Sequence, residues 1–240
     1  MADGGHDDWG LPEYWFPRPG GNATDELKIA LGRVADAHVL NGAGGWIPTP
    51  LPCPAWVLLT WLGEEMGLML HGSGHPAIET FTPRAPHDRS PDQFSKQRAV
   101  FATTDGVFAI FYAVLDRRTK GFSFLDAALK FADGDGGWSP MQYYFSLSRG
   151  APAAPWRPGA VYILPAEGFR QQAPYRVGDR TVLDPHFASR SAVRPLAKLR
   201  VEPRDFPFLD RVARHDRERV DARAAEEPAG FPWREPWMEP

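Results

Sequence analysis

From residue 69 the sequence reads Met-Leu-His-Gly-Ser-Gly, and from residue 100 to residue 112 it reads Val-Phe-Ala-Thr-Thr-Asp-Gly-Val-Phe-Ala-Ile-Phe-Tyr. The apolar run over 67–70 predicts a short buried strand that ends at His71. Residues 99–103 favour a second strand. Thr103-Thr104-Asp105 then offers caps to a helix that we expect to end near Leu115. Together these elements predict a ligand-binding cleft with a polar rim.

The composition is that of a globular protein. The chain has 240 residues, of which 43% are hydrophobic and 12% aromatic, so it can form one substantial packed domain and is not disordered throughout. Its 25 prolines and 23 glycines predict many turns and short strands. The net charge is −3, from 27 basic and 30 acidic side chains. This balance lacks the broad basic field of a dedicated nucleic-acid binder, so nucleic acid is not an expected partner.

The cysteine content and the hydropathy of the chain indicate its cellular location. The single cysteine, Cys53, excludes an intrachain disulfide, and its apolar neighbours favour an inert thiol over a reactive one. The acidic start of the chain lacks the apolar core of a secretory signal. The longest apolar run, 56–62, is too short to cross a bilayer. We therefore expect a soluble, cytoplasmic protein with no membrane partner.

The chain divides into three parts by pattern. Residues 1–66 begin with an aromatic segment expected to lie across the main domain, and continue with two helices, one capped by Thr24 and one that starts at Pro54. Residues 67–209 form the main domain. Residues 210–240 are expected to be a charged helix, to about residue 227, and a tail whose aromatic side chains dock onto another part: Phe231, Trp233 and Trp237.

Within the main domain, residues 117–158 look like an insertion that contains a strand at 143–148. The Asp-Gly run at 133–137 predicts a turn, because it lacks the acidic spacing and distal Glu of a calcium loop. The loop over 74–96 carries His and Asp side chains without tight ligand spacing, so we expect a mobile polar loop beside the cleft and no metal. Further strands are expected near 161–164, 181–183 and 196–201.

The order of these motifs resembles the compact bacterial ADP-ribosyltransferases that modify rifamycin antibiotics, and more loosely the ADP-ribosyltransferase superfamily. His71-Gly72-Ser73 stands where that family has a strand ending in His-Gly-Thr. Residues 100–104 match its strand with an aromatic residue before a threonine-rich helix start. Residues 161–165 with Phe169 match a third strand, and 187–193 a fourth segment. The resemblance extends over residues 68–205, with one long interruption.

The resemblance implies a fold and a reaction. The fold is α+β, with a split, mostly antiparallel β-sheet core around an NAD cleft, here preceded by a helical extension. The reaction is transfer of ADP-ribose from NAD, used as a substrate, to an acceptor that is a small molecule or a protein; such enzymes are glycosyltransferases.

The resemblance also implies site residues. His71 would hydrogen-bond a ribose hydroxyl, Phe101 or Tyr112 would stack on the nicotinamide ring, and Ser189 with Arg190 would hold a phosphate. We expect His71, Phe101 and Ser189 to line one pocket. The full set expected to bind NAD is His71, Gly72, Ser73, Phe101, Thr103, Tyr112, Ser189 and Arg190.

The sequence departs from the family at its catalytic carboxylate. Where the family has an aspartate after its aromatic residue, this chain has Arg170-Gln171-Gln172 after Phe169. Gln172 could orient an acceptor or water beside a catalytic His71, and Glu167 or Asp184 could supply a carboxylate from another position. Two alternatives to transfer therefore stay open, an NAD glycohydrolase and a non-catalytic nucleotide-binding or interaction module. Taken singly, His71 would be a structural histidine and Phe101 a core residue.

Overall fold

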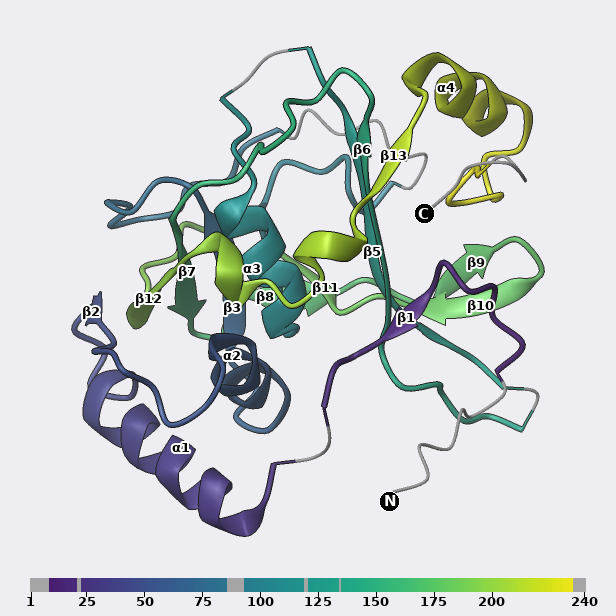
Figure 1. Ribbon diagram of the computed structural model, residues 1–240. Coiled ribbons are helices and arrows are strands. Elements are labelled where there is room, and N and C mark those ends of the chain that lie inside the picture. The colour runs from purple at the N-terminus through teal and green to yellow at the C-terminus, as the bar shows by residue number, and fades with distance from the viewer. Residues whose placement is uncertain (1–8, 21–22, 86–92, 119–120, 134, 235–240) are drawn as a thin grey trace.

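The computed structural model describes residues 9–20, 23–85, 93–118, 121–133 and 135–234 (Figure 1). Over these residues the chain has an α+β fold with four α-helices and two mostly antiparallel sheets. The α+β class and the mostly antiparallel sheets that the sequence predicted are thereby confirmed. In the same ranges, no helix is both long enough and apolar enough to cross a membrane.

The larger sheet has seven strands and places β3 near its centre. Its order is β2 (Gly45–Trp46), β12 (Ala197–Val201), β7 (Gly159–Leu164), β3 (Met69–Ser73), β4 (Val100–Thr103), β11 (His186–Ser189) and β8 (Phe169–Gln171). All neighbours in this sheet are antiparallel except β2 and β12, which are parallel. Strand β3 continues to Ser73, so the prediction that the strand ends at His71 was wrong: His71 is its middle residue.

Helix α3 (Gly106–Val114) packs directly on this sheet. Asp105 is its N-cap, as the sequence predicted, and its Oδ1 accepts from the Phe108 amide at 2.8 Å. A Cβ at Gly72 would lie 1.9 Å from the Ala109 carbonyl oxygen. Only glycine lets the helix backbone approach β3 this closely. In Figure 1, α3 lies between the larger sheet and the β5–β6 pair.

The two predicted N-terminal helices are confirmed. Helix α1 (Asp25–His38) starts at Thr24, whose Oγ1 accepts from the Leu27 amide at 3.3 Å. Helix α2 (Ala55–Glu64) follows Pro54 and packs against α3. That contact depends on a second glycine, because a Cβ at Gly63 would lie 2.0 Å from the Thr104 carbonyl oxygen.

The smaller sheet is assembled from distant parts of the chain. Its order is β1 (Phe16–Pro17), β6 (Gln142–Ser148), β5 (Phe124–Phe131), β10 (Arg180–Leu183) and β9 (Tyr175–Val177), and β13 (Ala213–His215) pairs with β6 in parallel. The segment expected as an insertion, 117–158, supplies the two longest strands of this sheet. The described residues of the Asp-Gly run, 133 and 135–137, form the predicted turn, in which Asp133 Oδ1 accepts from the Gly137 amide.

The C-terminal part differs from the expected charged helix. A short 3-10 helix, η1 (Pro203–Asp205), and another, η2 (Leu209–Arg211), lead into β13. Helix α4 begins only at Arg217 and ends at Glu226. Residues 213–215 form a strand because Ala213 and His215 are buried beside β6.

The aromatic tail docks as predicted. The Phe231 ring lies 6.2 Å from Trp15 and 5.9 Å from Tyr144, and Trp233 lies 5.2 Å from Phe231. The N-terminal aromatic segment and the tail therefore cover the same face of the smaller sheet. Trp237 lies outside the described residues.

A buried ion pair joins the N-terminal segment to both sheets. Arg18 donates to Asp105 Oδ2 at 2.7 Å and to both oxygens of Glu64 at 2.7 and 2.9 Å. The Tyr143 hydroxyl of β6 donates to the same Asp105 oxygen at 2.6 Å. Burial alone would lower the pKa of Arg18, but the Asp105 and Glu64 carboxylates outweigh it and the pKa is raised. One guanidinium thus ties residues before α1 to α2, to the α3 N-cap and to β6.

Candidate functional site

His71 is held at the point where β3 and β4 stop pairing. Backbone pairing between these strands joins Leu70 with Thr103. Directly after Leu70, the His71 side chain contacts β4 at Phe101. His71 Nδ1 donates to the Phe101 carbonyl oxygen at 2.7 Å, since a carbonyl only accepts. In the neutral ring Nε2 is then a hydrogen-bond acceptor.

The surroundings of His71 favour that neutral form. Burial lowers the pKa of His71, the bond to Phe101 partly opposes this, and the positive charge of Arg117 lowers the pKa further. His71 is therefore neutral at pH 7, with Nε2 available to accept from a hydroxyl.

The other side of the His71 ring is covered by residues that follow β3. The Phe81 ring lies 4.6 Å from His71, and Phe81 exchanges backbone hydrogen bonds with Val193. Opposite His71 on β7, the Tyr162 hydroxyl donates to the His75 carbonyl oxygen at 2.7 Å and accepts from the Ile78 amide. The described residues 74–85 of the expected mobile loop are thus bonded to the sheet, while 86–92 lie outside the described residues.

Phe101 does not share a face with His71. Side chains alternate along a strand, and Leu70 pairs with Thr103, so Phe101 lies on the α3 face and His71 on the other. The expectation that His71, Phe101 and Ser189 line one pocket was wrong for this reason. A one-residue difference in register places a side chain on the opposite side of a sheet.

Gln172 is linked to Phe101 through His186, a residue that was not among the site residues expected from the sequence. His186 Nδ1 donates to Gln172 Oε1 at 3.1 Å, and the His186 ring lies 5.1 Å from Phe101. Gln172 is buried, and its backbone continues the pairing of β8 with β11. His186 could have been found only from the pairing of β11 with β4, which puts it opposite Thr103.

The α3 face also carries Tyr112. Its ring packs against Phe108 and Phe124, and the Arg117 guanidinium lies 5.4 Å above it. Tyr112 and Phe101 thus lie on the same side of the larger sheet, while His71 lies on the other side at the divergence of β3 and β4.

The hydroxyls expected to bind NAD are used within the fold. Thr103 Oγ1 accepts from the Asp105 amide at 3.0 Å, which starts the α3 cap. Ser73 Oγ accepts from the His75 amide at 3.1 Å, and Ser189 Oγ from the Ser191 amide at 3.2 Å. Ser73 and Ser189 are buried, as is Thr103.

Three further expected or alternative residues are placed as follows. Arg190 is exposed beyond β11, with Nε 3.4 Å from Gln97 Oε1. Glu167 is exposed in the turn between β7 and β8. Asp184 is partly buried two residues before His186, so of the alternative carboxylates it lies closer along the chain to the Gln172 cluster.

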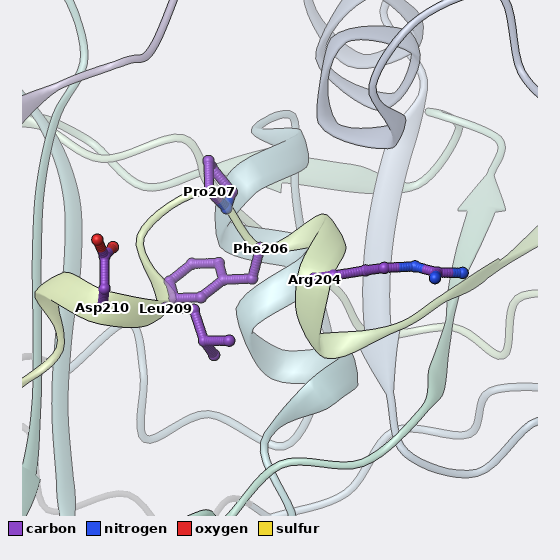
Figure 2. Close-up of a pocket in the computed structure, with 5 residues that line it drawn as sticks. All are labelled: Arg204, Phe206, Pro207, Leu209 and Asp210. Carbon is purple, nitrogen blue, oxygen red and sulfur yellow. The ribbon is translucent and has the colours of Figure 1, made fainter.

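One surface hollow of about 500 Å³ lies on the segment that carries η1 and η2 (Figure 2). None of the residues predicted for NAD lines it. Figure 2 shows Arg204 and Asp210 at opposite ends of the group, with Phe206 between them. The hollow is lined by Arg204, Phe206, Pro207, Leu209 and Asp210. Across the described ranges, no group of three His, Cys, Asp or Glu side chains could hold a metal ion.

Fold and site together define an α+β protein with two mostly antiparallel sheets and a histidine, His71, on the face of the larger sheet that lies opposite α3. No protein-family model, curated protein or solved structure matches the chain.

Proposed function

We propose that this chain is an NAD-binding protein of the ADP-ribosyltransferase type, with His71 as its contact to a ribose hydroxyl. The observation that carries the proposal is the commitment of His71 Nδ1 to the Phe101 carbonyl. This bond fixes the ring and directs Nε2, as an acceptor, away from β4. A neutral imidazole held in this way suits a sugar hydroxyl, which donates one hydrogen.

The proposal requires the ligand to contact both sides of the sheet. Phe101 and Tyr112 lie on the α3 face, and His71 lies on the other, next to the last pair of the β3–β4 ladder. A dinucleotide bound in this way would place its nicotinamide ring on the α3 side and a ribose at His71.

The chemistry after binding depends on a negative charge that the cluster around Gln172 does not supply. Loss of nicotinamide from NAD leaves positive charge on the anomeric carbon, and a carboxylate stabilises that charge. Gln172 is neutral and its Oε1 accepts from His186. This observation favours a second candidate function, binding of NAD without transfer. Transfer or hydrolysis would require a carboxylate from another position, such as Asp184 or Glu167.

Incubation with adenine-labelled NAD separates the candidates. Transfer moves the label to an acceptor, a glycohydrolase releases nicotinamide and free ADP-ribose, and a binding module holds NAD unchanged. A wild-type protein that neither binds NAD in calorimetry nor releases nicotinamide would refute the proposal.

The decisive variant is His71→Asn. The Asn amide can donate to the Phe101 carbonyl in place of Nδ1, but it has no group in the position of Nε2. We expect unchanged thermal stability and NAD binding weakened about 2- to 13-fold, the value of one hydrogen bond of roughly 0.5–1.5 kcal/mol. His75→Ala is the control, because His75 is exposed and follows the same strand. Equal NAD affinity in the two variants would contradict the role of His71.

A further inference from the structure

A histidine of the smaller sheet, His215, lies between two serine hydroxyls. It is the last residue of β13, which lies beside β6 and leads into α4 (Figure 1), and it is only 1% exposed. Its Nδ1 lies 2.8 Å from Ser146 Oγ, and its Nε2 lies 3.3 Å from Ser123 Oγ. The Arg149 amide donates to the His215 carbonyl oxygen at 2.9 Å, which fixes the backbone here. Each nitrogen of the imidazole therefore has a hydroxyl beside it.

The two serines differ in their access to solvent. Ser146 is fully buried within β6, whereas Ser123 is partly exposed, directly before β5. The backbone of Ser123 is held on both sides, because its amide donates to Ser148 Oγ at 2.9 Å and its carbonyl accepts from the Ser148 amide at 2.8 Å.

Two glycines lie next to Ser123. The register of β5 against β6, continued by two residues, puts Gly121 opposite Gly150, and a Cβ at Gly150 would lie 3.3 Å from the Gly121 carbonyl oxygen. Both glycines are exposed, and neither has a side chain that would cover Ser123. The Ser123 hydroxyl is thus the member of the cluster that a molecule from solvent can reach.

The surroundings of His215 keep its ring neutral at pH 7. Burial lowers the pKa of His215 to about 4, although the carboxylates of Asp221 and Asp216 act in the opposite direction. A neutral imidazole donates from one nitrogen and accepts at the other. When Nδ1–H donates to the buried Ser146, Nε2 accepts from the Ser123 hydroxyl, which is the arrangement of a nucleophile and its general base. A separation of 3.3 Å is typical of such pairs before a substrate binds.

We propose that Ser123 and His215 form a nucleophile–base pair that hydrolyses carboxylic esters, and that Ser146 is the residue that positions the imidazole. This activity is separate from the proposed function, because it involves neither NAD nor His71. The two proposals can therefore fail independently of each other.

The reaction needs only the ester and water. Ser123 Oγ attacks the acyl carbon and its proton passes to His215 Nε2. The ester C–O bond then breaks, and the departing alkoxide takes this proton and leaves as the alcohol. Water next attacks the acyl-serine and gives a proton to Nε2. Finally the bond from the acyl carbon to Oγ breaks, Oγ takes the proton back, and the carboxylic acid leaves.

The test uses a fluorophosphonate, which reacts with activated serine hydroxyls, and the ester p-nitrophenyl acetate. In the full chain we expect the fluorophosphonate on Ser123, as mapped by mass spectrometry. Ser123→Ala and His215→Gln should each lose the label and slow ester hydrolysis by at least about a hundredfold, the value of general base catalysis at its lower end. Ser191→Ala is the control, because Ser191 is exposed and follows β11 in the larger sheet. It should leave both readouts unchanged.

The positioning role of Ser146 has its own readout. Nitrogen NMR of the imidazole should find the proton of His215 on Nδ1 in the wild type. Ser146→Ala should move part of it to Nε2 and slow labelling about 2- to 13-fold, the value of one hydrogen bond. A merely structural Ser146 would lower the melting temperature and leave the tautomer and the labelling rate unchanged.

Three results would overturn the nucleophile–base pair. The first is a wild-type protein that the fluorophosphonate does not label, and the second is a label on a serine other than Ser123. The third is labelling of Ser123 at the same rate in His215→Gln and in the wild type. Because Ser123 is partly exposed, Ser123→Ala should melt at the temperature of the wild type, so its loss of label reports on reactivity.

Discussion

Replacing Arg18 with methionine tests whether the buried ion pair holds the two sheets together. The Asp105 side chain is fully buried, whereas Arg18 is 22% exposed. Arg18→Met leaves the Asp105 carboxylate without its cation, and breaking a buried pair in this way costs about 3–5 kcal/mol. The Tyr143 hydroxyl and the Phe108 amide still donate to Asp105, so we expect the lower end, about 3 kcal/mol.

Two further variants test whether the stability lost in Arg18→Met comes from the buried ion pair. Glu64 is one-third exposed, so Glu64→Gln removes a screened partner and should cost less than about 1 kcal/mol. In the double variant Arg18→Met/Asp105→Asn no charge is left buried, and Asn also caps helices well. Part of the lost stability should therefore return in the double variant.

The assay is unfolding in urea, supported by thermal melting. A loss of about 3 kcal/mol corresponds to a melting temperature lower by about 6–12 °C for a chain of this size. If Arg18→Met costs no more than Glu64→Gln, the ion pair contributes no more than a surface contact and the reasoning fails.

Two further perturbations test other parts of the fold. Burial lowers the pKa of His215 from 6.5 to about 4, so the unfolded chain binds the extra proton and stability should fall by up to about 3 kcal/mol as the pH drops through that interval. Urea titrations at several pH values should show that the stability of His215→Gln falls less steeply with decreasing pH than that of the wild type. The fall that remains in the variant comes partly from His71, whose pKa is also lowered. Parallel plots of stability against pH for the two proteins would exclude His215 as a source of the pH dependence. Gly72→Ala places a Cβ 1.9 Å from the Ala109 carbonyl oxygen and should cost at least about 1–3 kcal/mol. Gly32→Ala in α1 meets nothing within 4 Å and should gain about 0.5–1 kcal/mol, so equal melting temperatures for the two variants would contradict the packing argument.

The features predicted best from the sequence are those that depend on residues adjacent in the chain or on the chemistry of single side chains. Thr24 and Asp105 were identified as caps because a cap and its helix are adjacent in the chain. Tail docking followed from Phe231 and Trp233, whose exposure in water would be unfavourable.

Features that depend on the pairing of strands far apart in the sequence could not be predicted in the same way. The face on which Phe101 lies follows from the register of β4 against β3 and β11. The bond between His186 and Gln172 exists because β8 pairs with β11. Gly72 was expected to bind NAD, but the space beside it is occupied by α3, which sequence alone does not place there.

The edge of β6 also bears on how this protein is made. Residues 16–17 pair with 142–143, and residues 213–215 pair with 146–148, so the start and the end of the described chain complete the same strand. During synthesis, a ribosome that has just released β6 has not yet made β13. Every residue of β6 is buried in the finished fold, so its incomplete edge would meanwhile be open to other nascent chains. We expect chaperones that act during translation to engage residues 142–148 until β13 emerges.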